Sequence, residues 1–213
     1  MTLRSPTYKV RVRGPFACFT RPELKVERVS YEVMTPSAAR GVLDAILWKP
    51  AMRWIVERIH VLAPIRFAAV RRNEVNSKLA VRGDVSRYFA DEDRAQRNTI
   101  LLTDVDYVIE THFNMTDRAG PDDSLQKFEQ MFARRLAKGQ SFHAPYLGCR
   151  EFAARFETAP DRWEVPEELR ERRDLGLMLL DLDFESDGSG GATPRFFPAV
   201  LENGTIVVPE VRP

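Results

Sequence analysis

The chain has 213 residues, of which 44% are hydrophobic, and its formal net charge is +1. This length suits one large domain, or one domain with a smaller appendage, around a real hydrophobic core. No run of about 18 uncharged apolar residues occurs, and the first residues contain no apolar secretion segment, so we expect a cytoplasmic protein that does not enter a membrane.

A short strand and a capped helix come first along the chain. Residues 8–13 alternate polar and apolar side chains, which favours a half-buried strand that ends at Gly14-Pro15. The side chains expected on its outer face are basic: Lys9, Arg11 and Arg13. Residues 35–47 combine a threonine cap, a first-turn proline and an apolar stripe, which predicts a helix that stops before Pro50.

Strand-forming residues dominate the middle of the chain. Residues 54–61, 65–70 and 99–115 are rich in β-branched and aromatic side chains, and each segment favours a strand. We expect Asp106 and Glu110 to face outward from the last of them. Residues 71–98 are polar and charged without a clear period, and we interpret them as a long loop or insertion.

A second helix and a further strand follow. The helix is predicted to open at Asp122-Asp123 and to close at Gly139, a common C-terminal stop. Its apolar residues form one stripe, and a second stripe is cationic: Lys127, Arg134 and Lys138. Residues 147–152 favour a strand. The resulting βαββαβ order predicts an α+β protein whose N-terminal domain is ferredoxin-like, an architecture that RNA-recognition folds share.

The last third of the chain has a different character. Residues 157–173 are acidic, polar and proline-punctuated, as expected of a connector, and Asn203-Gly204 is a strong hairpin signal. The sequence therefore predicts two units, a ferredoxin-like domain over residues 1–155 and a connector with a smaller antiparallel β-sheet region over residues 156–213.

Common catalytic and metal-binding motifs are absent from the sequence, and we expect no cofactor and no metal site. His60 and His112 fall in predicted strands, where a structural role is favoured, whereas His143 lies in a loop and is better placed for proton transfer. Asp181 and Asp183 alternate on a strand. They form either a paired-carboxylate metal site or, as we favour, a solvated strand edge.

The cysteines give no sign of a metal site either. Cys18 and Cys149 are far apart in the sequence and have no metal-ligand spacing. We expect buried thiols and not a disulfide.

Basic residues cluster unevenly and stand beside aromatic ones. Residues 1–82 carry a net charge of +10 and the remainder −9, which suits a polyanionic partner, although the two charge sets can also mix on the surface. Arg71-Arg72, Trp48-Lys49 and Arg53-Trp54 are pairs that RNA-binding proteins use to hold phosphates and stack bases. Alternatively, both tryptophans pack in the core.

Several short segments have specific amino-acid sequences that the composition alone does not predict. They are Gly14–Glu23, Arg28–Tyr31, Thr35–Gly41 with Trp48–Pro50, Arg71–Glu74, Asp91–Arg97, Phe132–Arg135, Lys138–Gln140, Leu147–Phe152, Asp174–Gly176 and Asp181–Phe184. In this order, and over nearly the whole chain, they resemble the family-five CRISPR-associated proteins of subtype I-C (the d variant), which are RAMP-type proteins of antiviral defence.

The resemblance implies an endoribonuclease. Members of this family bind the repeat hairpin of precursor guide RNA and cut at its base by attack of the RNA's own 2′-hydroxyl, without a metal. They then stay on the 5′ handle in the surveillance complex, whose backbone and large subunits are the implied partners. This chemistry needs a base, a cation for the developing charge and a proton donor.

The resemblance also points to site residues, with two departures. Lys127 matches a family lysine, but Leu47 and Phe128 stand where a Tyr or His and a His are expected. We therefore expect Lys127 to act with His143 or Tyr146. The basic residues expected to hold RNA, with Lys49 or Arg134 on the phosphate, are Arg40, Lys49, Arg53, Arg71, Arg72, Arg134, Arg135 and Lys138.

Two alternatives remain at this stage. The two apolar replacements favour a non-cleaving RNA-binding subunit that caps the 5′ handle and nucleates assembly. The weaker alternative is a metal-dependent nuclease that acts on DNA through Asp181 and Asp183.

Overall fold

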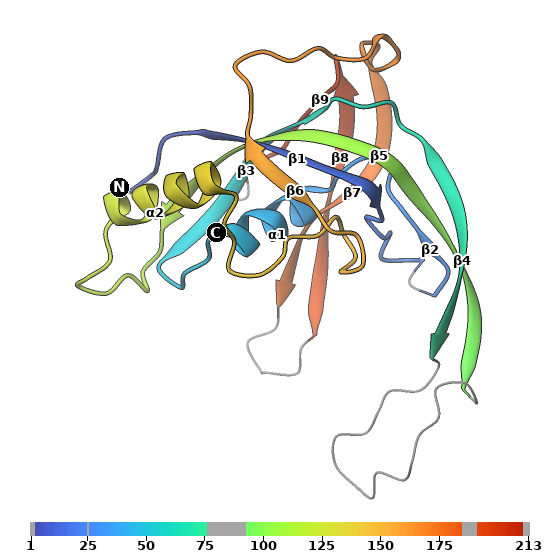
Figure 1. Ribbon diagram of the computed structural model, residues 1–213, viewed down its shortest axis with the longest axis horizontal. Helices are drawn as coiled ribbons and strands as arrows, with labels where there is room; N and C mark the ends of the chain where they lie inside the picture. The colour runs from blue at the N-terminus through green and yellow to red at the C-terminus, as the bar shows by residue number, and fades with distance from the viewer. Residues whose placement is uncertain (1–2, 25, 76–92, 185–190, 211–213) are drawn as a thin grey trace, which may run out of the picture.

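The computed structural model describes residues 3–24, 26–75, 93–184 and 191–210, and shows an α+β protein built on one curved sheet (Figure 1). Within these residues the strand order is β6-β1-β5-β3-β9-β8-β7, with β2 and β4 also paired to β5. The strands are β1 (Tyr8–Ala17), β2 (Arg28–Val29), β3 (Met52–Val61), β4 (Phe67–Val75), β5 (Arg94–Met115), β6 (Arg155–Thr158), β7 (Arg173–Phe184), β8 (Ala192–Glu202) and β9 (Thr205–Val207). The helices are α1 (Pro36–Ile46), α2 (Leu125–Lys138) and the short 3-10 helix η1 (Glu167–Leu169).

At the ends of α1 and α2, capping residues form hydrogen bonds with backbone groups that the helix itself leaves unpaired. Thr35 caps α1 as expected, and its hydroxyl accepts the N–H of Ala38 at 3.2 Å. Helix α2 begins later than the sequence indicates, because Ser124 and not Asp122-Asp123 is its cap. Gly139 closes α2 in the left-handed conformation, as predicted. No helix in the described part of the chain is long and apolar enough to cross a membrane.

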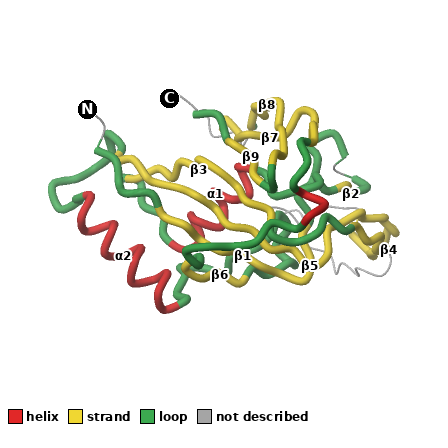
Figure 2. The backbone as a smooth tube through the Cα atoms, turned by 90° about the horizontal axis from the view of Figure 1, so that it is seen from above, coloured by secondary structure: helices red, strands yellow, loops and turns green. Residues whose placement is uncertain are grey.

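The helices cover the apolar face of the sheet. On β1, Val10 and Val12 are fully buried, and the Tyr8 ring on the same face contacts Phe132 of α2 with ring centroids 4.8 Å apart. The Trp54 ring of β3 lies 4.5 Å from the same Phe132 ring. Figure 2 shows α2 along one end of the sheet, with β7, β8 and β9 beyond β3. One core therefore joins both helices to the sheet.

The opposite face of β1 is polar, and its charges are paired within the protein. Lys9, Arg11 and Arg13 point to this face, and their nearest acidic partners are Glu110 at 3.6 Å, Asp106 at 2.6 Å and Glu157 at 2.9 Å, respectively. The connector covers part of this face, since the ring of Trp163 lies 5.2 Å from the Lys9 ammonium and 4.8 Å from the His60 ring. Glu110 lies on this outer face, as expected, but it is buried there because Arg58 and His60 enclose it.

Strand β1 does not end at Gly14-Pro15. Pro15 has no N–H to donate and takes no part in the ladder, but Phe16 and Ala17 resume pairing with Thr103 and Leu102 of β5. The proline therefore interrupts the strand without ending it.

The predicted loop at residues 71–98 is wrong at both of its ends. Residues Arg71 to Val75 belong to β4 and pair with Arg94 to Asn98 of β5, while residues 76–92 lie outside the described part. Polar side chains concealed the strands because this two-stranded ribbon extends beyond the sheet into solvent (Figure 1), so neither face needs an apolar period.

Residues 147–152 form a turn and not the predicted strand. Gly148 has a φ of +84°, and a Cβ there would lie 2.1 Å from the carbonyl oxygen of Cys18. The strand that pairs with β1 comes later, as β6. Leu147 is buried because the turn packs against the end of β1, where the N–H of Cys18 donates to the Leu147 oxygen at 3.0 Å.

The C-terminal strands continue the main sheet. Asn203 and Gly204 both have positive φ, at 48° and 68°, and form the predicted hairpin turn between β8 and β9. Strand β9 then pairs with β3 from Arg58 to His60.

Candidate nucleic-acid interface

The C-terminal end of α1 is the point where distant segments meet. The carbonyl oxygen of Ala45 accepts the N–H of Phe142 at 2.8 Å and that of His143 at 3.4 Å. The carbonyl oxygen of Ile46 accepts the guanidinium of Arg135 from α2. One cation and two N–H donors thus form hydrogen bonds with carbonyl groups that the helix leaves unpaired. The positive charge of Arg135 also interacts favourably with the negative end of the helix dipole.

Two large aromatic side chains stand exposed beside this helix end. Trp48 follows α1 by two residues and its side chain is 57% exposed, and Phe142 is 81% exposed. Trp54, in contrast, is buried, and its indole N–H donates to the Leu47 oxygen at 2.8 Å. Of the two alternatives for the tryptophans, core packing thus holds for Trp54, and an exposed π-surface holds for Trp48.

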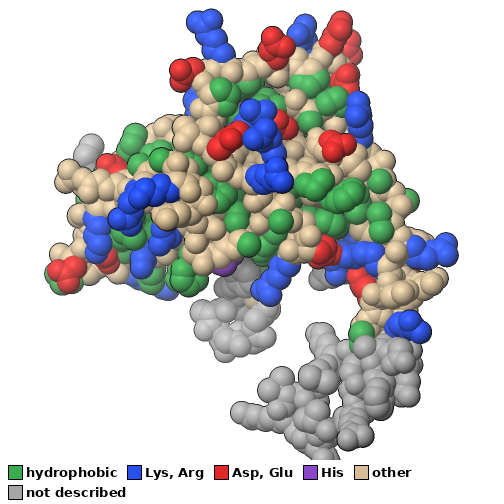
Figure 3. All heavy atoms as spheres, viewed as in Figure 1, with side chains coloured by type: hydrophobic (Ala, Val, Ile, Leu, Met, Phe, Trp, Pro, Cys, Tyr) green, Lys and Arg blue, Asp and Glu red, His purple; other side chains and the backbone are tan. Residues whose placement is uncertain are grey.

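Cationic side chains line the exposed side of α2. Figure 3 shows Lys and Arg side chains gathered over this helix. Lys127, Arg134 and Lys138 are all exposed, as the predicted stripe requires. The Lys127 ammonium lies 3.6 Å from Asp123 and donates to the Asp122 oxygen at 3.0 Å, whereas Arg134 and Lys138 have no acidic partner within the described residues.

The three expected catalytic residues are not in mutual contact. Lys127 lies in the first turn of α2, eight residues before Arg135, which corresponds to about 12 Å along the helix axis. His143 and Tyr146 follow the other end of α2. His143 is exposed and its ring contacts the Ala144 oxygen at 3.3 Å. The half-buried Tyr146 pairs through its backbone with Ala153.

Asp44 is a residue near this site that the sequence did not single out. Burial raises its pKa to about 6, with the nearby Asp181 adding to the rise, while Arg40 and His143 act in the opposite direction. No local signal marked it, because a single Asp in an amphipathic helix is ordinarily a solvated residue.

Arg40 and Arg53 converge on a buried carboxylate. The Arg40 guanidinium donates to Asp181, and an Arg53 nitrogen lies 3.7 Å from the same oxygen. The side chains border a shallow cleft between α1, β3 and β7. The solvated edge expected at Asp181 is therefore wrong, since only 9% of its side chain is exposed, whereas Asp183 is half-exposed and bound by Arg195.

The other predicted basic residues are distributed. Lys49 is exposed next to Trp48. Arg71 is exposed on the β4–β5 ribbon, but Arg72 on the same strand binds Glu74 at 2.8 Å and also binds Glu151. Arg72 therefore has a structural partner on each side.

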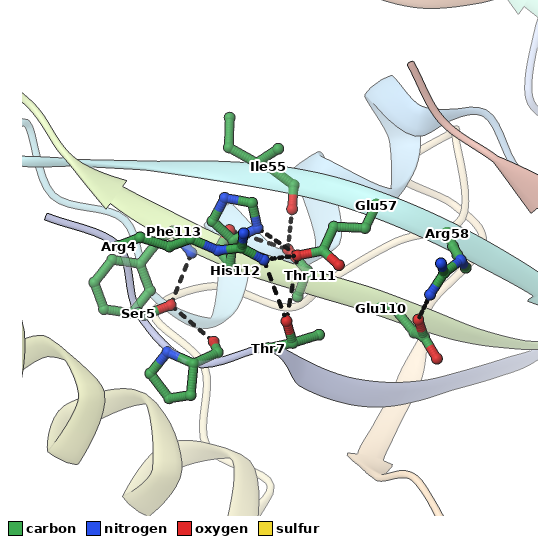
Figure 4. A network of polar contacts seen from close by, with 11 residues as sticks. Arg4, Ser5, Thr7, Ile55, Glu57, Arg58, Glu110, Thr111, His112 and Phe113 are labelled. Carbon is green, nitrogen blue, oxygen red and sulfur yellow. Dashed lines mark hydrogen bonds and ion pairs between the residues drawn. The ribbon is translucent and has the colours of Figure 1, made fainter. Parts of the chain in front are cut away.

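Two histidines belong to internal polar networks. The Nδ1 of His112 lies 2.6 Å from Glu57, which also binds Arg4 and Thr7 (Figure 4). His60 lies 2.9 Å from the Thr205 hydroxyl, and burial lowers its pKa. Both environments suit the structural role expected from the sequence.

Comparisons with known proteins give a consistent family. Residues 7–209 match the family model Cas5d, described as CRISPR-associated protein (Cas5). The chain is 49% identical to the CRISPR pre-crRNA endoribonuclease Cas5d of Mannheimia succiniciproducens, with 94% of each chain covered. It is 44% identical to the protein of the same name from Thermus thermophilus, covering 94% of this chain and 90% of the relative.

A solved structure agrees with the sequence relatives. The crystal structure of a CRISPR-associated protein superposes with a TM-score of 0.74 at 25% identity, over 99% of this chain and 95% of the other. The chain therefore belongs to the Cas5d family of CRISPR-associated proteins.

Proposed function

We propose that this protein binds the repeat hairpin of precursor guide RNA in the cytoplasm, cleaves it through metal-independent attack of a 2′-hydroxyl, and then keeps the 5′ handle. The names of two relatives at 49% and 44% identity support the endoribonuclease activity. The observation that carries the proposal is the exposed aromatic and cationic surface at the end of α1 and along α2. We name this surface, made of Trp48, Lys49, Phe142, Arg134 and Lys138, the helix-end surface.

The choice of face follows from charge pairing. The polar face of the sheet, which RNA-recognition folds commonly use, has Arg11, Arg13 and Arg58 bound to carboxylates and Trp163 lying over it. Its cations would have to leave these partners to bind phosphate. Arg134 and Lys138 can bind phosphate without first breaking an ion pair. Unpaired bases beside a hairpin can stack on the exposed rings of Trp48 and Phe142.

The order of the helices and strands supports a ferredoxin-like fold, the architecture that RNA-recognition proteins share. We infer that β1, α1, β3, β5, α2 and β6 make one ferredoxin-like unit, since they follow a βαββαβ order and lie in the sheet as β6-β1-β5-β3. The β4–β5 ribbon is then an insertion between the middle strands. Because β6 (Arg155–Thr158) belongs to this unit, we further propose that the smaller second unit begins after β6, at residue 159 and not at residue 156, and extends to residue 213.

We assign the catalytic roles by position. Lys127, held by Asp123 at the start of α2, would stabilise charge on the scissile phosphate, and His143 or Tyr146 would exchange a proton with the attacking or leaving oxygen. Because Lys127 and His143 do not touch, both roles require that the RNA strand lies along α2 and that the two side chains extend toward the scissile phosphate from either end of the helix. Arg40, Arg53, Arg71, Arg72 and Arg135 remain proposed RNA contacts, and Arg71 is exposed on its strand.

The decisive experiment is cleavage of the cognate repeat RNA in EDTA. We expect a cut hairpin with a 2′,3′-cyclic phosphate end, and loss of cutting with retained binding in Lys127→Ala. Lys9→Ala is the matched control, because Lys9 lies on the paired sheet face. An uncut hairpin at high enzyme excess would contradict the cleavage proposal.

A non-cleaving subunit is the second candidate. The observation that favours it is the burial of Leu47 and Phe128, which are 0% and 1% exposed and so cannot serve as substitutes for polar catalytic groups. It would bind the 5′ handle and the backbone and large subunits of the subtype I-C complex. Robust cutting that Lys127→Ala abolishes would exclude it.

A metal-dependent DNA nuclease has less support. Asp181 is bound by two arginines and Asp183 by a third, so their carboxylates have partners other than a cation. Binding of duplex DNA with Mg²⁺-dependent cutting that Asp181→Asn abolishes would favour it.

A further inference from the structure

Two thiols that are 131 positions apart in the sequence lie next to each other. Cys18 follows the end of β1 and is fully buried, and Cys149 is half-buried in the turn at residues 147–152. The Thr20 hydroxyl lies 3.5 Å from the Cys18 sulfur and 3.9 Å from the Cys149 sulfur. The Cys149 thiol also contacts the Cys18 carbonyl oxygen at 3.6 Å.

A guanidinium group points at one of the two sulfurs. The Nη1 of Arg28 lies 3.4 Å from the Cys149 sulfur and 3.5 Å from Glu151, and its Nη2 lies 3.4 Å from Glu74. Arg72 binds both of these carboxylates. The two arginines and two glutamates balance in charge, and the Nη1 of Arg28 that contacts Glu151 also donates to the Cys149 sulfur.

This environment makes the two thiols unequal. The hydrogen bond from the Cys18 thiol lowers the pKa of Cys149 to about 6, against the effect of burial, and Thr20 and Arg28 lower it further. The same hydrogen bond, together with burial, raises the pKa of Cys18. Cys149 is therefore the more acidic thiol of the pair, and the thiolate that it forms is the reactive species.

We propose that Cys149 and Cys18 form a peroxide-sensitive modification site, in which Cys149 is the attacking thiolate and Cys18 the resolving thiol. The Cys149 sulfur attacks one peroxide oxygen, the O–O bond breaks, and Cys149 becomes a sulfenic acid while hydroxide leaves. The Cys18 sulfur then attacks the Cys149 sulfur, the S–O bond breaks, and the Cys18 proton leaves with the hydroxyl as water. The peroxide is the oxidant, and the product is one disulfide.

The site joins segments that the sequence resemblance marked and that lie outside the helix-end surface. It brings together Gly14–Glu23, Arg28–Tyr31, Arg71–Glu74 and Leu147–Phe152. A disulfide would take the sulfur away from Arg28 and covalently join the turn to β1. The proposal is independent of RNA cleavage, since it concerns the chemistry of the free protein.

The test uses the full chain, reduced, freed of thiols and then exposed to a small excess of hydrogen peroxide at neutral pH. We expect non-reducing peptide mass mapping to find a Cys18–Cys149 cross-link with the loss of two hydrogen atoms. In Cys18→Ser the reaction stops at the sulfenic acid, which dimedone traps on Cys149. Where Cys18→Ser does not fold, Cys18→Ala serves, with circular dichroism as the check.

Two arginine variants provide the matched comparison. Arg28→Gln removes the donor to the sulfur. When the rates are compared at about pH 5, below the Cys149 pKa of about 6, a rise of one unit in that pKa lowers the thiolate fraction about tenfold, and we expect Cys149 oxidation to slow by about that factor. Arg150→Gln removes the same charge from an exposed neighbour of Cys149 in the chain and should leave the rate unchanged. No cross-link in the folded wild type, or equal rates in both arginine variants, would overturn the proposal.

Discussion

Arg40 of α1 and Asp181 of β7 form an ion pair that fastens the first helix to the C-terminal strands. The same carboxylate lies 3.7 Å from Arg53 on β3, so three elements meet at one buried group. Because charges this far from water are stable only with partners, the pair fixes how α1 lies against β7.

Removal of Asp181 should therefore destabilise the fold. We expect Asp181→Ala to lower the free energy of unfolding by about 2–4 kcal/mol, because two guanidinium groups lose their shared partner. Asp183→Ala is the matched control on the same strand. Its side chain is 50% exposed, and its loss should cost at most about 1 kcal/mol. Urea denaturation of both variants measures the difference, and equal losses would contradict the structural role of the pair.

The exposed aromatics should contribute to RNA affinity and not to stability. Trp48→Ala and Phe142→Ala should each weaken binding of the repeat RNA by about 5- to 100-fold, the range that loss of one stacked base produces. Their melting temperatures should stay close to that of the wild type. Phe196→Ala removes a comparably exposed ring from β8 and should leave affinity unchanged. Fluorescence anisotropy with labelled repeat RNA measures all three, and an effect of Phe196→Ala equal to the others would argue against a specific stacking site.

Asp44 should make stability depend on pH. Its pKa of about 6 in the folded protein exceeds that of an unfolded Asp, near 3.9, so the folded state holds the proton more tightly. The resulting penalty is fully present above pH of about 6 and disappears as the pH falls through about 4. Asp44→Asn should therefore stabilise the protein at pH 7–8 by about 1 kcal/mol, a value reduced for the partial exposure of the carboxylate, and should have no effect at pH 4. Thermal melts across this pH range test the expectation, and a gain that persists at pH 4 would refute it.

The turn glycine should tolerate no side chain. Gly148 has a positive φ, and a Cβ there meets the Cys18 backbone at 2.1 Å, so Gly148→Ala should cost several kcal/mol or prevent folding. Gly139 also has a positive φ, of +61°, but a Cβ there meets nothing within 4 Å. Gly139→Ala should cost only about 1 kcal/mol. Soluble yield and urea denaturation compare the two, and equal tolerance would show that the turn does not pack against β1 as described.

Local signals in the sequence determined most of the elements. The cap at Thr35, the stop at Gly139 and the turn at Asn203-Gly204 were all predictable, because each depends on the φ or the hydrogen bonds of one or two residues. The strand at residues 54–61 was predictable too, because its β-branched and aromatic side chains favour extended backbone. The predictions were wrong for segments in which the burial of side chains does not follow from a regular helix or strand period. Leu147 and Phe152 are apolar because the turn that contains them packs against the end of β1, and the ribbon is polar because it projects into solvent.

The tertiary structure alone decided which of these residues become neighbours in space and which are buried. Trp48 and Trp54 are equivalent in the sequence, yet one is exposed and the other is buried against α2. Asp181 became a buried partner of Arg40, and Cys149 became the neighbour of Cys18, through strand pairing and helix docking that join segments more than 100 positions apart. Periodicity encodes the face on which a side chain lies, but the identity of its neighbour depends on long-range packing, which no local pattern records.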